Sequence, residues 1–541
     1  MREPSPATVA EAARRLEDEL RSYLAAARAT SPSLAERAES AWRSGRVHEA
    51  AALAEAALAS GSSADAHAEM HLLMARCEVM LGRSPAACER LRTEAAAIVD
   101  SSPEQAAAML VEASRAAFMS GDRTAALATA ARAEALTRHG PPSVRLDAEL
   151  AVGLARIQAG GESAEALMEQ TLQSIATAPA DLFTAIHRWS AALLWAERYD
   201  DARNVLERAI ERSRSLRRLE LLPIALDTLA AVEYRIGRWS AAEAHSAEAL
   251  RLNRLRDAPF ETASNLTTLA RIEAARGNET STTERLREAE YLDPSGGLVL
   301  GYTASAAALL ELSLGRPDRA VEHLDRIATS AASSFEPSVF RWEADFVEAL
   351  ARAGRAADAR AALDRFAERA SGSTRIWTRA SVRRCRGLLA SVDDFDLEFN
   401  EAMRWHSRSP MPFERARTEL CYAERLRRAR RAVDARTWFS SALAIFEQLG
   451  AEPWALRARR GLAGPGRRAR GLELGIPLSP HERQVAALVQ RGATNREAAA
   501  ALFVTPKTIE YHLSSIYRKL NIRSRTELSY ALSTAAPRRP A

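Results

Sequence analysis

Near the carboxyl end of the chain, apolar positions follow a helical period in three short segments. A fourth short segment follows them in the sequence. Each face repeats every three or four residues, as one side of a helix requires. These faces are Val485, Leu488 and Val489 in the first segment, Ala498, Ala499 and Leu502 in the second, and Ile509, Leu513, Ile516 and Leu520 in the third. Only residues 503–505 separate the second segment from the third. So short a connection predicts two sharply angled helices, a helix-turn-helix.

A helix start signal precedes each of the four segments. A Ser or Thr followed three residues later by Glu forms a capping box, because the two side chains bond the backbone N–H groups that a helix start leaves unpaired. The boxes are Ser479 with Glu482, Thr494 with Glu497, and Ser524 with Glu527, while Thr505 with Pro506 marks the third start. Helices are therefore expected to begin near residues 480, 495, 506 and 525, the third spanning 506–520.

The third segment has a polar face opposite its apolar one. If the apolar face is buried, the residues that point outward are Lys507, Glu510, Tyr511, Ser514, Ser515 and Arg518. In a helix-turn-helix, the N-terminal part of this helix enters the major groove of DNA. The alternative is a polar face that only meets solvent.

The segment resembles the LuxR-type helix-turn-helix over residues 478–532. The residues that carry the resemblance are Leu478, Glu482, Val485, Gly492, Asn495, Glu497, Ala499, Leu502, Val504, Thr508, His512, Ile516, Lys519, Leu520 and Arg525. The resemblance implies that helix 506–520 is the recognition helix and that Thr508 and Lys519 lie near phosphates. It also implies that the fourth helix, with Tyr530 and Ala531, makes dimer contacts on DNA.

Each predicted DNA-binding residue has an expected role. We expect Glu510, Tyr511 and Ser514 at base edges, because side chains read sequence there. Lys507, Thr508, Arg518 and Lys519 are expected to position the DNA backbone, and Asn495 completes the predicted set.

Three other positions in the segment are informative. Glu510 stands where many relatives carry Lys; a carboxylate accepts from cytosine N4 but repels phosphate. Ala498 replaces the family's usual Ile and thins the core. His512 is expected to pack half-buried rather than to bind a ligand.

A second periodic pattern fills the chain upstream. A turn-like residue is followed five residues later by a small one, at intervals of 36 to 40 residues. The pairs are Gly45 and Ala50, Gly82 and Ala87, Gly121 and Ala126, Gly161 and Ala166, Glu197 and Ala202, Gly237 and Ala242, Gly277 and Thr282, Gly315 and Ala320, and Gly354 and Ala359, with degenerate copies at Asp393 and Arg430. Small residues that precede several turns by seven positions are Ala38, Ala75, Ala230 and Ala270. Two helices of a hairpin would cross closely at such positions.

This pattern resembles the tetratricopeptide repeat, lengthened toward 39 residues, as in the sensor region of MalT-like regulators. A helix hairpin cannot bury its apolar face alone, so neighbours stack. The expected fold is all-α, a right-handed α-solenoid of about eleven helix-hairpin repeats followed by a four-helix LuxR-type domain; the alternative is an irregular helical domain. The expected boundaries are 1–31 for a capping helix, 32–462 for the solenoid, 463–476 for a linker, 477–536 for the DNA-binding domain and 537–541 for a tail.

Charge and composition narrow the function further. The net charge is +5, but residues 457–541 contain sixteen Lys and Arg against five Asp and Glu, which leaves the remainder acidic. Lysine occurs only as Lys507 and Lys519, so the chain has no P-loop, which needs a lysine for the phosphates. Catalysis, cofactors and a metal site are not expected, because no GxSxG, HExxH or CxxC motif occurs. Cys77, Cys88, Cys385 and Cys421 are expected to be buried free thiols.

The leading hypothesis is a cytoplasmic bacterial transcription regulator. Its carboxyl-terminal domain would bind double-stranded promoter DNA, with a homodimer on DNA as one option, and its solenoid would bind a protein, peptide or small-molecule effector. The alternative is a solenoid scaffold with only nonspecific DNA tethering. Six tryptophans are candidates for lining a groove, but large aromatic residues at helical spacing are more often packed between helices: Trp189, Trp195, Trp342, Trp377, Trp405 and Trp438.

Overall fold

The computed structural model forms two compact units, Met1–Arg459 and Arg460–Ala541. It describes residues 33–44, 46–60, 64–159, 190, 193–215, 222–255, 258–293, 298–463, 482, 485–486, 488–489, 493–502, 506–520, 524 and 527–528. The predicted capping helix 1–31, linker 463–476 and tail 537–541 lie outside the described residues, apart from Ala463 at the end of a helix.

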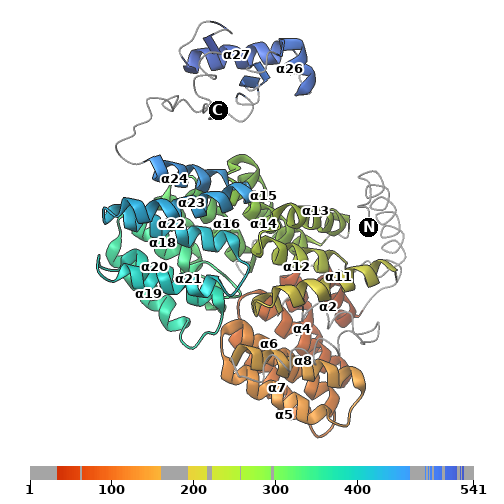
Figure 1. Ribbon diagram of the computed structural model, residues 1–541. Coiled ribbons are helices and arrows are strands. Elements are labelled where there is room, and N and C mark those ends of the chain that lie inside the picture. Colours follow the sequence, from red (N-terminus) through yellow and green to blue (C-terminus); the bar gives the residue numbers. More distant parts are fainter. Residues whose placement is uncertain are drawn as a thin grey trace. The chain divides into compact units, whose positions relative to one another are not determined.

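The described part of the first unit consists of helices, with no strand (Figure 1). In chain order they are α2 (Leu34–Arg43), α3 (Val47–Ala59), α4 (Ala64–Met80), α5 (Ser84–Ile98), α6 (Pro103–Ser120), α7 (Arg123–Thr137), α8 (Pro142–Ala159), α11 (Tyr199–Ser215), α12 (Leu222–Arg235), α13 (Trp239–Leu255), α14 (Pro259–Arg276), α15 (Glu279–Leu292), α16 (Leu298–Ser313), α17 (Pro317–Ala328), the 3₁₀ turn η2 (Ala331–Ser334), α18 (Glu343–Arg352), α19 (Ala356–Arg369), α20 (Ile376–Leu389), α21 (Phe395–His406), α22 (Pro412–Arg428), α23 (Ala432–Leu449) and α24 (Glu452–Ala463). Consecutive helices pair as hairpins, which confirms the predicted all-α solenoid.

The predicted turn positions adopt the left-handed backbone conformation that ends a helix. Positive φ angles between 63° and 84° occur at Gly82, Gly121, Glu197, Gly237, Gly277, Gly315, Gly354 and Arg430. Gly45 and Gly161 lie outside the described residues. The copy at Asp393 is different, because α20 and α21 are joined by a turn in which the Asp394 amide donates to Ser391 Oγ at 3.3 Å.

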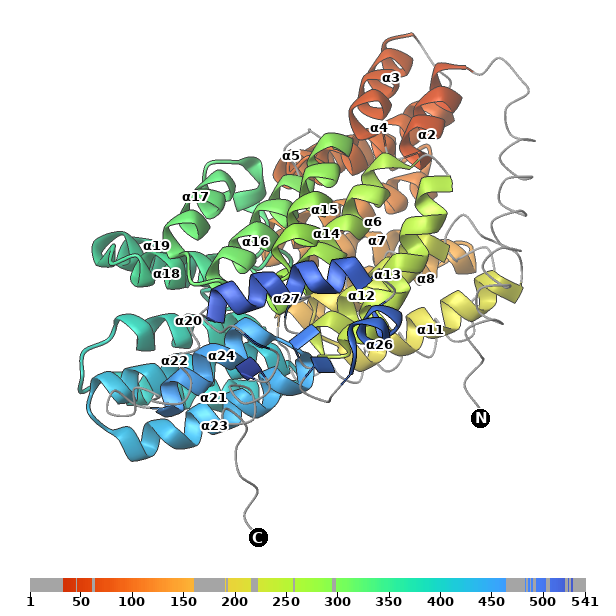
Figure 2. The ribbon, with the colours of Figure 1, turned by 90° about the horizontal axis from the view of Figure 1, so that it is seen from above.

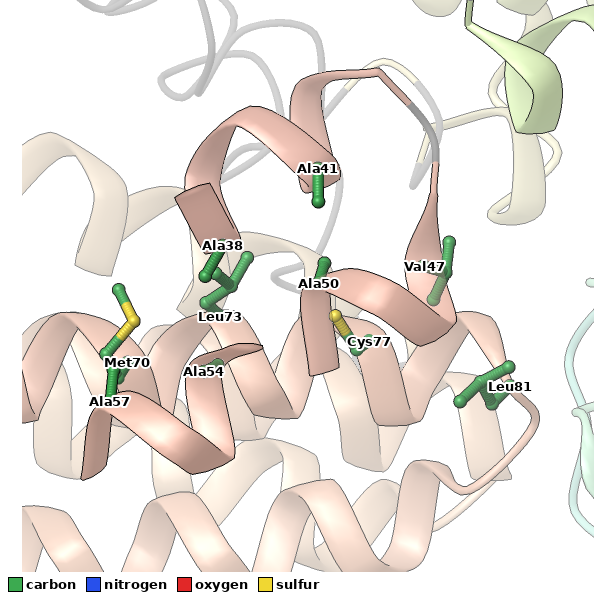
Figure 3. Packing of buried hydrophobic residues seen from close by; sticks show 10 residues of the cluster. All are labelled: Ala38, Ala41, Val47, Ala50, Ala54, Ala57, Met70, Leu73, Cys77 and Leu81. Atoms are coloured by element: carbon green, nitrogen blue, oxygen red, sulfur yellow. The ribbon is translucent and has the colours of Figure 1, made fainter. Parts of the chain in front are cut away.

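The small residue after each turn is buried between the two helices of its hairpin. Ala50, Ala87, Ala126, Ala202, Ala242, Thr282, Ala320 and Ala359 are 0% exposed. The preceding small residues Ala38, Ala75, Ala230 and Ala270 are also buried. Figure 3 shows such a contact at the first repeats, where Ala38 on α2 and Ala50 and Ala54 on α3 face Leu73 and Cys77 on α4.

Helices α12, α14 and α16 lie side by side and form an inner layer, with α13, α15 and α17 as their hairpin partners (Figure 2). The inner helix α16 has buried side chains on nearly all sides. Helices α18, α20, α22 and α24 continue this layer and lie beside α12–α16 in Figure 1.

The turns of the early hairpins also contact loops much later in the chain. Ser334 Oγ donates to Gly82 O at 3.0 Å, and Arg123 Nη2 donates to Ser371 O at 3.3 Å, 248 residues along the sequence. An added Cβ would lie 2.5 Å from Pro412 at Gly237 and 2.3 Å from Pro453 at Gly277. Glycine at these two positions is required by both the backbone conformation and the approach of the second half of the unit.

Glu197 is a non-glycine residue in the left-handed conformation, with φ 63°. Its carboxylate accepts from the backbone N–H of Ile376 at 2.6 Å and of Trp377 at 3.1 Å, at the N-terminus of α20. It also pairs with Arg341 at 2.7 Å, and both side chains are under 10% exposed. The strain of this conformation, about 1–2 kcal/mol, is therefore offset by a helix cap and a buried ion pair.

Buried charges join the inner helices of the second half. Arg417 on α22 contacts Asp345 at 2.6 Å and Glu348 at 2.8 Å, both on α18, and Arg457 on α24 contacts Glu348 and Glu424. Burial alone would raise the pKa of Glu348, but Arg417 and Arg457 hold that pKa well below its ordinary value. The carboxylate stays charged at neutral pH and fixes which helices meet.

The remaining sequence expectations concern side chains inside the unit. All four cysteines are free and buried, as predicted, and burial raises the pKa of Cys77 to about 12. Trp195 stacks on Phe118, and Trp377 is 2% exposed, which favours packing over a groove at these positions. In the part of the chain that the structure describes, no helix is long and apolar enough to cross a bilayer.

Replacing Glu197 tests the long-range contact. We expect Glu197→Ala to destabilise the first unit by about 3–5 kcal/mol, because it leaves Arg341 buried without its partner. Glu207→Ala, which removes an exposed carboxylate paired with Arg203 on α11, should cost at most about 1 kcal/mol. Urea denaturation followed by circular dichroism measures both, and equal costs would contradict the assigned role.

Candidate nucleic-acid interface

The second unit has a compact apolar core built from the predicted faces. It contains helices α26 (Asn495–Ala501) and α27 (Pro506–Leu520), and residues 482, 485–486 and 488–489 of the first segment are helical. The buried cluster consists of Val485, Ala486, Val489, Ala498, Ala499, Ile509, Leu513, Ile516 and Leu528, with Leu488, Leu502 and Tyr517 packed against it. The predicted burial pattern is confirmed, and α27 has the predicted bounds.

Two of the predicted start signals are visible in the structure. The Thr494 backbone N–H donates to Glu497 Oε2 at 2.7 Å, and the Glu497 N–H donates to Thr494 Oγ1 at 3.3 Å, which completes a capping box at α26. The Glu527 N–H donates to Ser524 Oγ at 3.2 Å. Ser479 and Thr505 lie outside the described residues.

The face of α27 opposite the core presents part of the predicted reading set. Lys507, Glu510 and Ser514 are exposed, at spacings of three and four residues that keep them on one side of the helix. Tyr511 and Arg518 follow the same spacing along α27, and Lys519 adjoins Arg518 near the end of the helix. The side chains of Tyr511, Arg518 and Lys519 lie outside the described part, so their predicted roles stay predictions.

The other predicted residues are only partly accessible. Asn495, at the start of α26, and Thr508, in the first turn of α27, are half-buried. Most of the surface of these two residues is already covered by the protein, which suits a contact with the DNA backbone better than insertion into a groove. His512 is half-buried, as expected for a packing histidine.

Ser515 corrects one expectation about the outward face. Its Oγ donates to Glu482 Oε1 at 2.8 Å, and Glu482 is 4% exposed. Ser515 therefore faces the first helix and ties it to α27, instead of pointing outward. Sequence reasoning missed this bond because Glu482 was assigned to a capping box on its own helix.

Comparison with known proteins covers the same segment. Residues 476–531 match the family model described as bacterial regulatory proteins, luxR family. The segment is a LuxR-type helix-turn-helix domain. The described helices α26 and α27 lie within this domain.

Curated relatives of the LuxR-type domain are regulators. Over 87 residues, the chain is 38% identical to a putative HTH-type transcriptional regulator of Mycobacterium bovis, which covers 15% of this chain and 10% of that protein. Over 50 residues, it is 48% identical to the transcriptional regulatory protein ComA of Bacillus subtilis, with 9% and 23% covered. The chain therefore spans about a tenth of the length of the first of these relatives.

Two solved structures match larger parts of the chain at low identity. The Rap protein complexed with competence and sporulation factor has a TM-score of 0.41 and 16% identity, over 64% of this chain and 99% of that one. Yeast Tom70 has a TM-score of 0.29 and 14% identity, over 79% of this chain and 95% of that one.

The capping box at α26 provides a test of local stability. We expect Thr494→Ala to cost about 1 kcal/mol, because the N-terminal N–H groups of α26 lose their acceptor. Thr494→Ser keeps the hydroxyl and should behave like the unmodified chain. Hydrogen exchange of the amides of residues 495–501 in the full chain measures the difference, and equal protection in the two variants would contradict a capping role.

Proposed function

We propose that this chain is a DNA-binding transcription regulator whose LuxR-type domain reads double-stranded promoter DNA through α27. The observation that carries the proposal is the two-sided character of α27, with Ile509, Leu513 and Ile516 buried and Lys507 and Glu510 exposed. A helix held by its inner face presents its outer face rigidly to a groove.

The charge distribution supports binding to a polyanion. From residue 457 onward, basic residues outnumber acidic ones by eleven, whereas residues 1–456 carry a net charge of −6. Contacts with phosphates supply most of the affinity of DNA-binding proteins and make it salt-dependent. The acidic first unit is therefore proposed to stay off the DNA.

For the solenoid we propose a role in binding an effector, either a protein, a peptide or a small molecule. Polar side chains link its inner helices: Ser264 Oγ on α14 donates to Asp227 on α12 at 2.8 Å, and Arg271 on α14 donates to Ser305 on α16 at 3.0 Å. Burial lowers the pKa of the neighbouring Arg235 to about 10 and raises that of Tyr302. Such half-buried polar groups in a low-dielectric setting suit specific recognition of a polar ligand.

The same proposal includes no catalytic step and allows a homodimer on DNA. The two relatives named above are regulators, and two domains on a two-part site raise affinity through symmetry and effective concentration. Tyr530 and Ala531, the proposed dimer contacts, lie outside the described residues.

The competing function is a solenoid scaffold that only tethers nonspecifically to DNA. It is favoured by the size of the first unit relative to the LuxR-type domain. The two functions differ in whether a base-contacting side chain matters, because a nonspecific tether uses phosphates alone.

Replacing Tyr511 separates the two functions. We expect Tyr511→Ala to weaken binding to preferred sites by about 1–3 kcal/mol, with little change on other sequences. Tyr291→Ala, which removes a tyrosine 85% exposed on α15, is the matched control. Selection of bound sites from random DNA, followed by anisotropy titrations, measures site preference; if the full chain prefers no sequence, the regulator proposal fails.

Replacing Lys519 tests a phosphate contact. We expect Lys519→Ala to weaken binding to every sequence and to reduce the slope of log K against log salt by about one. Titrations at several salt concentrations measure the slope. Arg404→Ala, which removes one exposed positive charge from the first unit, is the control, and an unchanged slope for Lys519→Ala would reject the assignment.

A further inference from the structure

Two histidines on α4 bring their ring nitrogens together. His67 and His71 are four residues apart, so their side chains share one face of the helix. Their Nε2 atoms are 3.2 Å apart, and the ring centroids are 4.7 Å apart at an interplanar angle of 65°. Both rings therefore aim the same nitrogen at one point.

A carboxylate from the next helix reaches the same point. Glu94 lies on α5, and its Oε2 is 3.7 Å from Nε2 of His71. The three potential ligand atoms, one from each residue, all lie within 4.8 Å of one another. Two imidazole nitrogens and one carboxylate oxygen thus converge from two helices of one hairpin.

The distances fit a shared transition-metal ion. Zinc binds histidine nitrogen at about 2.0–2.1 Å in tetrahedral sites, so two such nitrogens on one ion lie about 3.3 Å apart. The observed 3.2 Å is close to this spacing. A hydrogen bond between two imidazoles has a similar length, but it would not account for the Glu94 carboxylate beside the pair, which supplies the third ligand of a zinc site with three protein ligands.

The surroundings hold the two helices in place. On the same helix, Met70, Leu73 and Cys77 are buried in the cluster of α2, α3 and α4, as Figure 3 shows. Leu91 and Ala95 fix α5 from its buried side. Ligands on packed helices keep their geometry better than ligands on loops.

A positive charge beside the cluster, Arg90, is already paired. Arg90 on α5 binds Glu78 on α4 at 2.7 Å, with both Nε and Nη2 donating to the carboxylate. Glu94 is therefore not committed to Arg90 in the structure, and its carboxylate is placed to serve the histidines.

We propose that His67, His71 and Glu94 bind one divalent transition-metal ion, with Zn²⁺ the best match to two imidazoles and one carboxylate. Three protein ligands leave a fourth position for water or for a group of a partner. Binding would join α4 to α5 and stabilise the early repeats of the solenoid by mass action. The expectation of no metal site rested on HExxH and Cys patterns, which do not include a pair of histidines completed by the next helix.

Metal titration of the full chain, without an affinity tag and after removal of metal by a chelator, tests the site. We expect one equivalent of Zn²⁺ by calorimetry, one equivalent of Co²⁺ with visible d–d absorption, and a melting temperature that rises with added Zn²⁺. His67→Gln and Glu94→Gln should each weaken binding at least about tenfold. His139→Gln, which alters an exposed histidine, should leave it unchanged.

Several results would overturn the proposal. These are no saturable binding by the unmodified chain, or equal affinity in His67→Gln, Glu94→Gln and the control. Circular dichroism of each variant checks that weaker binding does not come from unfolding. The assay contains no DNA, so its result tests the metal site independently of the regulator proposal.

Discussion

Most of the described hairpins of the first unit depend on a contact between their two helices at a small residue. Ala87, Ala126 and Ala242 are 0% exposed five residues after a left-handed turn, where the second helix begins to run back along the first. A larger side chain there would push the helices apart, because protein interiors have no spare volume. This contact recurs at nearly constant spacing along the chain. It therefore sets the angle at which each hairpin packs against the following hairpin.

Buried charges add specificity that apolar packing alone would not give. The inner helices are rich in alanine and leucine, and such surfaces can slide against one another. Arg417 contacts Asp345 and Glu348 at distances under 3 Å, so α22 can meet α18 in one register only. Buried ion pairs often contribute little net stability but are costly to break, which makes them better suited to fixing an arrangement than to strengthening it.

The sequence predicted local features well and distant ones poorly. The turn positions, the buried small residues, the capping box of Thr494 and the core of the LuxR-type domain follow from periods of a few residues, and the structure confirms them. The pairing of Glu197 with Arg341 and of Glu482 with Ser515 joins positions 144 and 33 residues apart. No periodic pattern encodes such contacts, and the same holds for Glu94 beside the two histidines. The exposed face of α27 was predictable because it is the complement of a buried face on one helix.

The contacts between early turns and late loops constrain how this chain can evolve. Most solenoids gain or lose repeats by duplication, because each unit meets only its neighbours. Here Arg123 contacts Ser371, which lies 248 residues later in the chain, and Glu197 contacts Ile376, which lies 179 residues later. A repeat inserted between Glu197 and Ser371 would separate both pairs at once, because it would move Ser371 away from Arg123 and Ile376 away from Glu197. The number of repeats in the stretch that the structure describes between Arg123 and Ile376 is therefore fixed by geometry, and variation is confined to side chains.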